Sequence, residues 1–210
     1  MTKRFAHTLV RPPAGCEDEE LLRRVLIGEE EAFDILYDRR ERLVYQFALR
    51  MSGSATLAED VTQDVFMALI RHGHLFDPAR GTLVKYLLGM TRNRVLTLLQ
   101  RERSFVPLME DEGKEEIAVA ENLIAEHDPS VDLARAERVE AVRQAILALP
   151  WHYREVVVLC NLEELSYEEA AGLIGCPVGT VRSRLNRARA LLAEKLKVVK
   201  GGSEGEARVS

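Results

Sequence analysis

Four arginines are crowded into residues 182–189, and no acidic residue follows them until Glu194. A guanidinium group donates paired hydrogen bonds to a phosphate or to the edge of a guanine, and the amide of Asn186 can pair with an adenine. These residue types at this spacing predict binding in the major groove of duplex DNA. A merely solvated helix face could carry the same arginines, but it would not explain the helix signals that precede them.

Those signals are typical of a helix-turn-helix. Ser166 and Glu169 have the spacing of a capping box, so a helix should begin at Tyr167. Residues 175–177, Gly-Cys-Pro, should end it, because Gly permits positive φ and Pro cannot continue a helix. A second helix should begin within residues 178–180, with a core-facing side formed by Val181, Leu185, Ala188 and Leu192. The second helix of such a pair enters the major groove.

A second basic segment, the basic strip of residues 80–103, predicts contact with nucleic-acid phosphates. Its only acid is Glu102, and its cations are Arg80, Lys85, Arg92, Arg94, Arg101 and Arg103. Residues 72–81 contain Asp-Pro and Gly breakers and are predicted to form a loop. Thr82 should then cap a helix that reaches about Arg103.

Charge is distributed unevenly along the 210 residues, whose net charge is −5. Residues 104–134 carry one base and nine acids, whereas residues 20–103 and 135–200 are both net basic. We therefore expect an acidic linker, with a short helix near residues 115–124, that holds two basic parts apart.

Helical periodicity dominates both basic parts, and no strand pattern is present. Outside the helix-turn-helix, the predicted helices cover residues 20–27, 30–51, 82–103, 135–148 and 150–162. A further helix should open with a capping box formed by Thr56 and Glu59 and continue through Ile70. The predicted fold class is all-α, with two small helical domains, and residues 201–210 are expected to be frayed.

Several classes of protein are excluded by what the sequence lacks. No apolar run could span a bilayer and the N-terminus is a poor signal peptide, so we expect a cytoplasmic protein. Cys16, Cys160 and Cys176 have no metal-ligand spacing, although a sensing role for them or for His72 and His74 stays open. There is no Gly-rich phosphate loop, nucleophile elbow or HExxH motif, so we predict no enzyme, no metal and no cofactor.

Five segments of the chain carry a family resemblance: AFDILYDRRERLVYQFALR (32–50), AEDVTQDVFMALIR (58–71), FDPARGTLVKYLLGMTRNRVLTLLQRER (76–103), LPWHYREVVVLCNLEELSYEEAAGLIG (149–175) and CPVGTVRSRLNRARALL (176–192). They resemble a bacterial RNA polymerase sigma factor of the extracytoplasmic-function group. Residues 20–103 resemble sigma region two, and residues 135–197 resemble region four. Residues 104–134 take the place of the linker, which leaves 1–19 as an N-terminal extension and 198–210 as a flexible tail.

The resemblance implies three binding surfaces and two main partners, core RNA polymerase and promoter DNA. Helix 58–71 would dock on the polymerase core through Glu59, Asp60, Gln63, Asp64 and Phe66. The segment 76–103 would recognise and melt the minus-ten element through Phe76, Arg80, Lys85, Tyr86, Arg92, Asn93 and Arg94. The second helix of the helix-turn-helix would recognise the minus-thirty-five element through Thr180, Arg182, Ser183, Arg184, Asn186, Arg187 and Arg189.

The resemblance also implies an anti-sigma factor as a partner, and it would thread the acidic linker through polymerase channels that otherwise hold nucleic acid. Phe76 could instead anchor its loop in the core, and Tyr86 stands where the family often has Trp. The alternative function is a helix-turn-helix regulator that acts without polymerase. That function would explain residues 166–189, but neither the docking helix nor the basic strip. A degenerate sigma factor kept only for sequestration is disfavoured by the intact cations of both segments.

Overall fold

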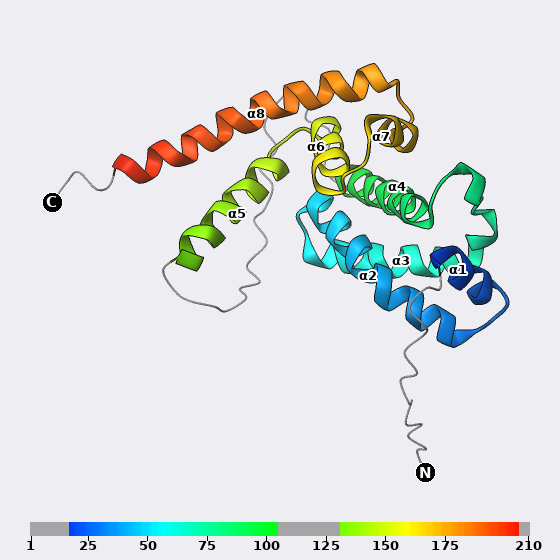
Figure 1. Cartoon of the computed structure of the whole chain (residues 1–210). Helices are drawn as coiled ribbons and strands as arrows, with labels where there is room; N and C mark the ends of the chain where they lie inside the picture. The colour runs from blue at the N-terminus through cyan, green and yellow to red at the C-terminus, as the bar shows by residue number, and fades with distance from the viewer. Residues whose placement is uncertain (1–16, 105–130, 206–210) are drawn as a thin grey trace, which may run out of the picture.

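The computed structural model describes residues 17–104 and 131–205, and every element in those ranges is helical, which confirms the predicted all-α class (Figure 1). Residues 17–104 form the first module, with helices α1 (Asp18–Leu26), α2 (Glu30–Ser52), α3 (Ala55–His72) and α4 (Leu83–Ser104) and two 3-10 turns, η1 (Gly73–Leu75) and η2 (Pro78–Arg80). Residues 131–205 form the second module, with α5 (Val131–Leu147), α6 (Trp151–Val157), a π-helical turn η3 (Val158–Leu162), α7 (Tyr167–Ile174) and α8 (Val178–Gly205).

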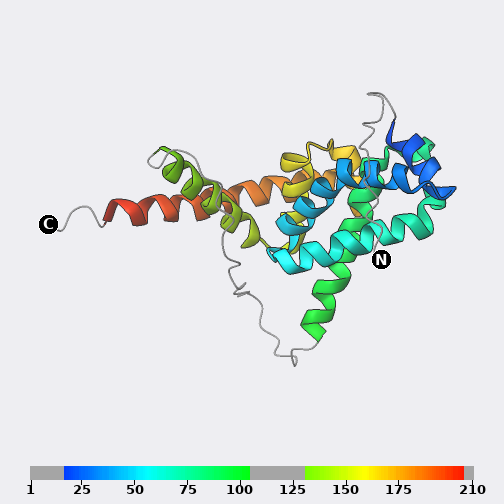
Figure 2. The same cartoon turned by 90° about the horizontal axis from the view of Figure 1, so that it is seen from below.

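The first module is built around α2, which packs against α1, α3 and α4. Fully buried apolar side chains from three of these helices meet in its core, among them Leu36, Phe47, Val61 and Leu87. Gly53 ends α2 with a φ of 77°, a left-handed conformation that favours glycine. The C-terminal turns of α4 project from the bundle (Figure 2).

The second module contains the predicted helix-turn-helix as α7 and α8. Both hydrogen bonds of the capping box between Ser166 and Glu169 are present, and Gly175 ends α7 with a φ of 79°. Three of the four residues predicted to face the core, Val181, Leu185 and Ala188, are buried, and the fourth, Leu192, is half-buried. Local capping signals and helical periodicity therefore determined this unit correctly.

Some boundaries differ from the sequence prediction. The capping box of Thr56 and Glu59 is wrong: Ser54 is the N-cap of α3, and its side chain accepts the Leu57 N–H at 3.2 Å. The loop at 72–81 contains η1 and η2, and α8 continues to Gly205 where a frayed tail was expected. The short helix expected near residues 115–124 lies outside the described residues.

The two modules are packed against each other and are not held apart as the linker's charge had suggested. One cluster of buried apolar residues includes side chains of both modules, among them Met51 of the first module and Leu149 of the second. The guanidinium of Arg154, on α6, donates to the Met51 carbonyl oxygen at 2.7 Å. A Cβ added at Gly53 would lie 3.1 Å from the Leu147 side chain, so the end of α2 approaches α5 closely. Apolar contacts and buried hydrogen bonds therefore hold the two modules together.

Candidate nucleic-acid interfaces

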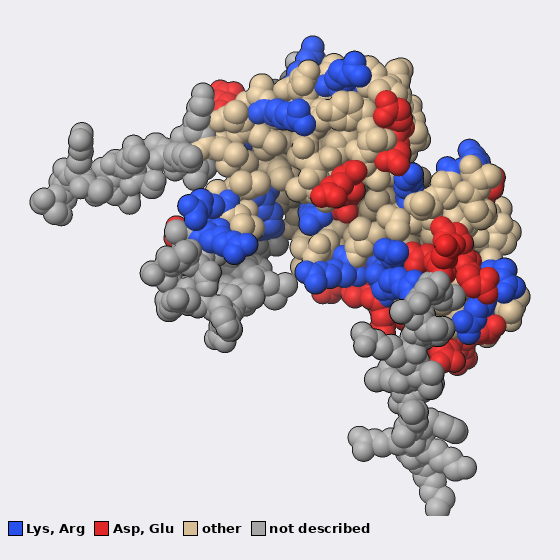
Figure 3. Space-filling model, viewed as in Figure 1, with Lys and Arg blue, Asp and Glu red and all other residues tan. Residues whose placement is uncertain are grey.

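The N-terminal half of α8 presents an exposed basic surface. We call it the recognition surface, and it consists of Thr180, Arg182, Ser183, Arg184, Asn186, Arg187 and Arg189. Five of these residues are exposed, and Thr180 and Arg184 are half-buried. Arg182, Arg187 and Arg189 form no ion pair with any described residue, so their guanidinium groups are available to a ligand. Lys and Arg residues gather on the upper edge of the molecule, over this part of α8 (Figure 3).

Arg184 differs from the other arginines because a carboxylate of its own module holds it. Its Nη1 lies 3.4 Å from Oε1 of Glu155, a residue of α6 whose side chain is only 3% exposed. Ser183 is also engaged, because its hydroxyl donates to the Thr180 carbonyl at 3.0 Å. The recognition surface thus has free arginines and one arginine of fixed position, which suits phosphate contacts that set register.

The basic strip lies along α4 and the turn before it, beside a groove between α4 and α7. The groove is lined by Leu75, Phe76, Asp77, Arg80, Lys85, Tyr86, Asn93, Glu168, Glu169 and Leu173, among others. The Phe76 ring is half-buried, with its centroid 5.5 Å from that of Tyr86. Asn93 is exposed. Phe76 therefore anchors its loop and still lines the groove, so the two roles left open for it are compatible.

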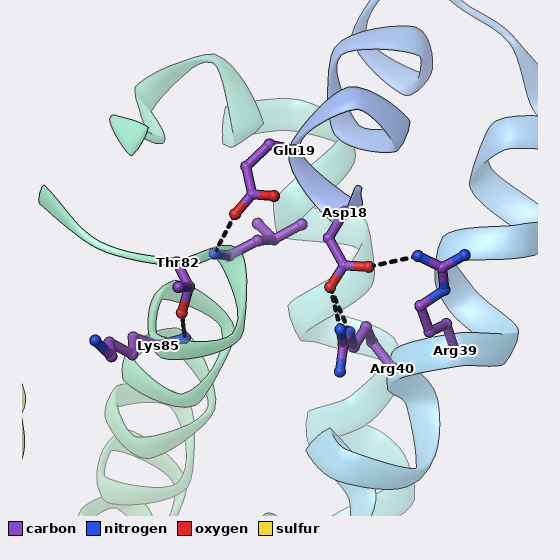
Figure 4. A network of polar contacts seen from close by, with 7 residues as sticks. Asp18, Glu19, Arg39, Arg40, Thr82 and Lys85 are labelled. Carbon is purple, nitrogen blue, oxygen red and sulfur yellow. Dashed lines mark hydrogen bonds and ion pairs between the residues drawn. The ribbon is translucent and has the colours of Figure 1, made fainter. Parts of the chain in front are cut away.

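The start of α4 is fixed by Thr82, the cap predicted from the sequence, and by Glu19, which no sequence pattern indicated. Glu19 on α1 accepts the Leu83 N–H at 3.3 Å, and the Thr82 hydroxyl accepts the Lys85 N–H at 3.5 Å (Figure 4). Asp18 is buried and pairs with Arg39 at 2.9 Å and Arg40 at 2.5 Å, which ties α1 to α2. These contacts confirm Thr82 as a cap. They also set the position from which Lys85 and Tyr86 project.

The predicted docking helix, α3, bears an acidic face that borders an aromatic groove between α2 and α3. Glu59, Asp60 and Gln63 are exposed, and Phe33, Tyr37, Glu41, Tyr45, Glu59, Thr62, Gln63, Phe66 and Met67 line the groove. Two predicted contact residues differ from the others. Asp64 accepts a hydrogen bond from Arg94 at 2.6 Å, and Phe66 is only 2% exposed, with its ring 4.7 Å from that of Tyr37. Phe66 shapes the groove from within and cannot itself make a broad contact.

Carboxylates of the second module reach two cations of the basic strip. Lys85 Nζ lies 2.5 Å from Glu169, and the guanidinium of Arg92 lies 2.8 Å from Glu155. The pKa of Glu169 falls from 4.5 to about 2, chiefly because Lys85 donates to it and further because the Ser166 backbone N–H does. Glu155 is not among the residues predicted from the sequence, although an acid inside the apolar run of α6 indicates a buried ion pair.

Cysteine and histidine chemistry finds no support in the arrangement of the described residues. Cys160 and Cys176 are half-buried, and Cys16 lies outside the described residues. Burial raises the pKa of the Cys160 thiol, which opposes reactivity. Among residues 17–104 and 131–205, no cluster of acidic, His or Cys side chains could hold a metal ion. No helix in these ranges is long and apolar enough to cross a bilayer.

Comparison with known proteins assigns both modules to sequence families. Residues 36–105 match Sigma-70 region 2, and residues 139–192 match Sigma-70, region 4. The chain is 31% identical over 192 residues to the ECF RNA polymerase sigma-E factor of Escherichia coli K12, covering 85% of this chain and 94% of that protein. It is 29% identical over 178 residues to SigW of Bacillus subtilis, covering 84% and 95%. It is also 34% identical over 169 residues to SigE of Mycolicibacterium smegmatis, covering 79% of this chain but only 62% of that protein.

Two solved structures share the fold. One is CnrH in complex with the cytosolic domain of CnrY, with a TM-score of 0.61 and 26% identity over 86% of this chain and 97% of the other. The other is the sigma factor RpoE from Bartonella quintana in complex with the anti-sigma factor NepR, with a TM-score of 0.62 and 26% identity over 79% and 97%. The two modules therefore define a protein of the sigma-70 class. The chain belongs to the ECF RNA polymerase sigma factors.

Proposed function

We propose that this sigma factor binds core RNA polymerase through α3 and contacts promoter DNA through α4 and α8. The observation that carries the proposal is the presence, on one chain, of a basic surface in each sigma module and of an acidic face on α3 that borders an aromatic groove. Acids on α3 would repel DNA and suit a basic protein partner. The division of labour thus follows from the sign of charge on each helix.

The recognition surface is proposed to bind the minus-thirty-five element as duplex DNA. The exposed guanidinium of Arg187 and the exposed amide of Asn186 can pair with base edges in the major groove. Arg184 and Arg189 suit phosphate contacts, which position the helix without specifying sequence. Asn186 is our candidate for the residue that sets promoter preference.

The groove beside α4 is proposed to hold the minus-ten element as a separated strand. Melted bases need stacking surfaces and edge hydrogen bonds, and the groove offers Phe76, Tyr86 and Asn93 for these purposes. Arg80, Lys85 and Arg92 would track the phosphates, and Arg94, paired with Asp64, would hold α3 and α4 together. Strand separation in this scheme uses binding energy alone, and we propose no bond-making chemistry for the protein.

The acidic face is proposed to dock on the polymerase core. Glu59, Asp60 and Gln63 are exposed, and Glu59 and Gln63 border the aromatic groove, so a basic helical partner could place apolar side chains in the groove and cations on its rim. Asp64 contributes through its pair with Arg94. We place this function in the cytoplasm, the compartment of bacterial polymerase.

An anti-sigma factor is a further proposed partner, because the similar RpoE of Bartonella quintana was solved with one. A helix-turn-helix regulator acting without polymerase is not favoured, because it would have no use for a sigma region 2. The domain limits expected from the sequence, with region two in residues 20–103 and region four in 135–197, are retained in the proposal.

The experiment that tests the function is in vitro transcription by core RNA polymerase on fragments of genomic DNA, with and without this protein. We expect discrete transcripts only when the protein is present, and their start sites would give the promoter sequence. The Arg187→Ala variant is the matched comparison, because it should give fewer of these transcripts while remaining folded. Identical transcripts from core polymerase alone would contradict the proposal.

A further inference from the structure

Helix α1 lies directly against the start of the loop that carries Phe76. Residues 73–82 form this loop, which we call the minus-ten loop, and they join α3 to α4. A Cβ added at Gly73 would lie 2.9 Å from the Leu22 side chain and 3.3 Å from that of Leu26, closer than ordinary contact. Leu22 is only 2% exposed, so it has little room to move. The backbone of Gly73 is thus held against α1.

The same helix holds the end of the minus-ten loop. Glu19 accepts the Leu83 N–H at 3.3 Å, and this N–H lies in the first turn of α4, where the helix itself supplies no acceptor. A carboxylate at this position also meets the positive end of the α4 helix dipole. Glu19 thus acts from another helix as a second cap beside Thr82, whose hydroxyl accepts the Lys85 N–H.

Helix α1 is itself fixed to the first module. Asp18 is buried and pairs with Arg39 and Arg40 of α2. The next residue, Glu19, points instead to the start of α4 (Figure 4). The apolar side of α1 lies in the core, where Leu21 is fully buried. Contacts with α2 and with the core therefore fix the position from which α1 supports the loop.

This support comes from outside the segment that matches the family. Sigma-70 region 2 matches residues 36–105, which include Phe76 and Tyr86 but none of α1. The contribution of α1 is therefore separate from that match. It depends on the contacts that α1 makes with Gly73 and Leu83.

Strand separation makes a demand on the minus-ten loop that duplex binding does not. Phosphate contacts to a duplex depend on charge and tolerate small movements of a loop. A separated base must instead stack on an aromatic ring and meet hydrogen-bonding groups at fixed distances. A loop that is ordered before DNA binds loses less conformational entropy when it captures the base. The supports at Gly73 and Leu83 should therefore favour opening and leave the initial binding unchanged.

We propose that α1 is a positioning helix for strand separation: Glu19 and Leu22 hold the minus-ten loop in the shape that captures unpaired bases. The inference rests on the proposed minus-ten role of the groove beside α4. Neither residue contacts DNA in this scheme. Both act through the two ends of the loop, and Phe76 and Tyr86 make the contacts with the bases.

The test separates binding from opening in the complete polymerase complex. A promoter with 2-aminopurine in its minus-ten element becomes brighter when its strands separate, and stopped-flow mixing at several concentrations of the complex gives the rate. The half-saturating concentration reports the initial binding, and the limiting rate reports opening. Glu19→Ala should lower the limiting rate about three- to ten-fold, as expected for the loss of a helix cap, with the half-saturating concentration unchanged.

Two further variants on α1 are the controls. Glu19→Gln should restore most of the limiting rate, because its amide oxygen can still accept the Leu83 N–H. Glu20→Ala should open the promoter at the wild-type rate, because Glu20 pairs with Arg23 of α1 itself at 2.6 Å, in an exposed contact.

Gly73→Ala is a second probe, at the other end of the loop. The φ of Gly73 is −61°, which suits any residue, so the added methyl group acts through its contact with Leu22. It should lower the limiting rate as Glu19→Ala does. Wild-type opening by both variants would overturn the positioning role, and so would a loss of initial binding as large as the loss of opening rate. A wild-type complex that binds the promoter without any 2-aminopurine signal would instead overturn the proposed minus-ten function, and the inference with it.

Discussion

At the scale of single residues, the structure separates arginines that look alike in the sequence. Arg187 is exposed and forms no ion pair with a described residue, whereas Arg184 and Arg92 share the buried carboxylate of Glu155. A guanidinium group without an ion pair can bind DNA without first breaking a contact within the protein. A paired one must first leave its carboxylate. Exposure therefore decides which arginines are the best candidates for base contacts.

Arg187→Ala should weaken binding of the polymerase complex to its promoter by about 1–3 kcal/mol, the value of one bidentate contact to a base. Fluorescence anisotropy with a labelled promoter at fixed salt measures the change. The melting temperature should not move, because Arg187 is exposed. Unchanged promoter affinity would remove Arg187 from the recognition surface.

Asn186→Ala should relax selectivity at one base pair of the minus-thirty-five element, because the exposed amide can pair with the edge of a base. Selection from a library randomised across that element, followed by sequencing, gives the preference at each position. The expected result is loss of enrichment at one position, with the others retained. If the enrichment at every position is unchanged, a residue other than Asn186 sets the promoter preference.

Glu59→Lys should reduce binding to core polymerase, because the exposed carboxylate lies on the rim of the aromatic groove. Competition with the wild-type protein for core polymerase measures the loss. Asp64→Lys is a poorer choice, because it also breaks the contact with Arg94 that joins α3 to α4. Equal competition by Glu59→Lys and wild type would argue against the acidic face as the docking site.

At the scale of elements, polar side chains cap the starts of α3, α4 and α7 and fix where these helices begin. Ser166 and Glu169 cap α7, Thr82 and Glu19 hold the start of α4, and Ser54 caps α3. A cap satisfies N–H groups that the helix itself cannot pair. Since the docking helix and the basic strip both follow such caps, their register depends on single polar side chains.

Ser54→Ala should lower the free energy of unfolding by about 1 kcal/mol, because the Leu57 N–H loses its acceptor. Thr56→Ala is the matched control. It should change stability by less than about 0.5 kcal/mol, because Thr56 is exposed and is not the cap. Urea unfolding followed by circular dichroism measures both, and equal losses would restore Thr56 to the role that the sequence suggested.

At the scale of the whole molecule, packing of the modules converts a set of DNA-contacting cations into internal ion pairs. Glu169 reports on this state, because its pKa of about 2 depends first on Lys85. Because the pKa of Glu169 is lowered, its pair with Lys85 contributes its full stabilisation of the packed modules at pH values above the ordinary pKa of 4.5. That contribution is lost as pH falls toward 2.

Arg50 lies 2.6 Å from Glu163, so Arg50→Glu places two carboxylates opposite each other and should weaken the packing of the modules. Carbon-detected NMR titration of Glu169 should therefore show its pKa rising toward the ordinary range in Arg50→Glu. The pKa should stay somewhat depressed there, because Ser166 still donates to the carboxylate. In the swapped variant Arg50→Glu/Glu163→Arg, the pKa should return to about 2. The same pKa of Glu169 in all three proteins would mean that Lys85 stays in place when Arg50 is reversed.

Local chemistry in the sequence determined the all-α class, the helix-turn-helix, the basic strip and the family. Capping boxes, Gly-Cys-Pro breakers and three- and four-residue apolar steps act within a few residues, so α7 and α8 could be placed without knowing what they pack against. The error at Thr56 has the same origin, because two overlapping cap signals compete and only packing chooses between them.

Tertiary structure alone decided which charges are free. Arg92 and Glu155 are 63 residues apart, and Arg50 and Glu163 are 113 apart, so no local pattern could pair them. The sequence showed an acidic linker and predicted two modules held apart. The fold instead brought them together, because a shared apolar core and the hydrogen bond from Arg154 to Met51 act only once both modules have formed. The sequence thus identified the surfaces that can meet DNA, and packing of the modules decided which of their cations are paired within the chain.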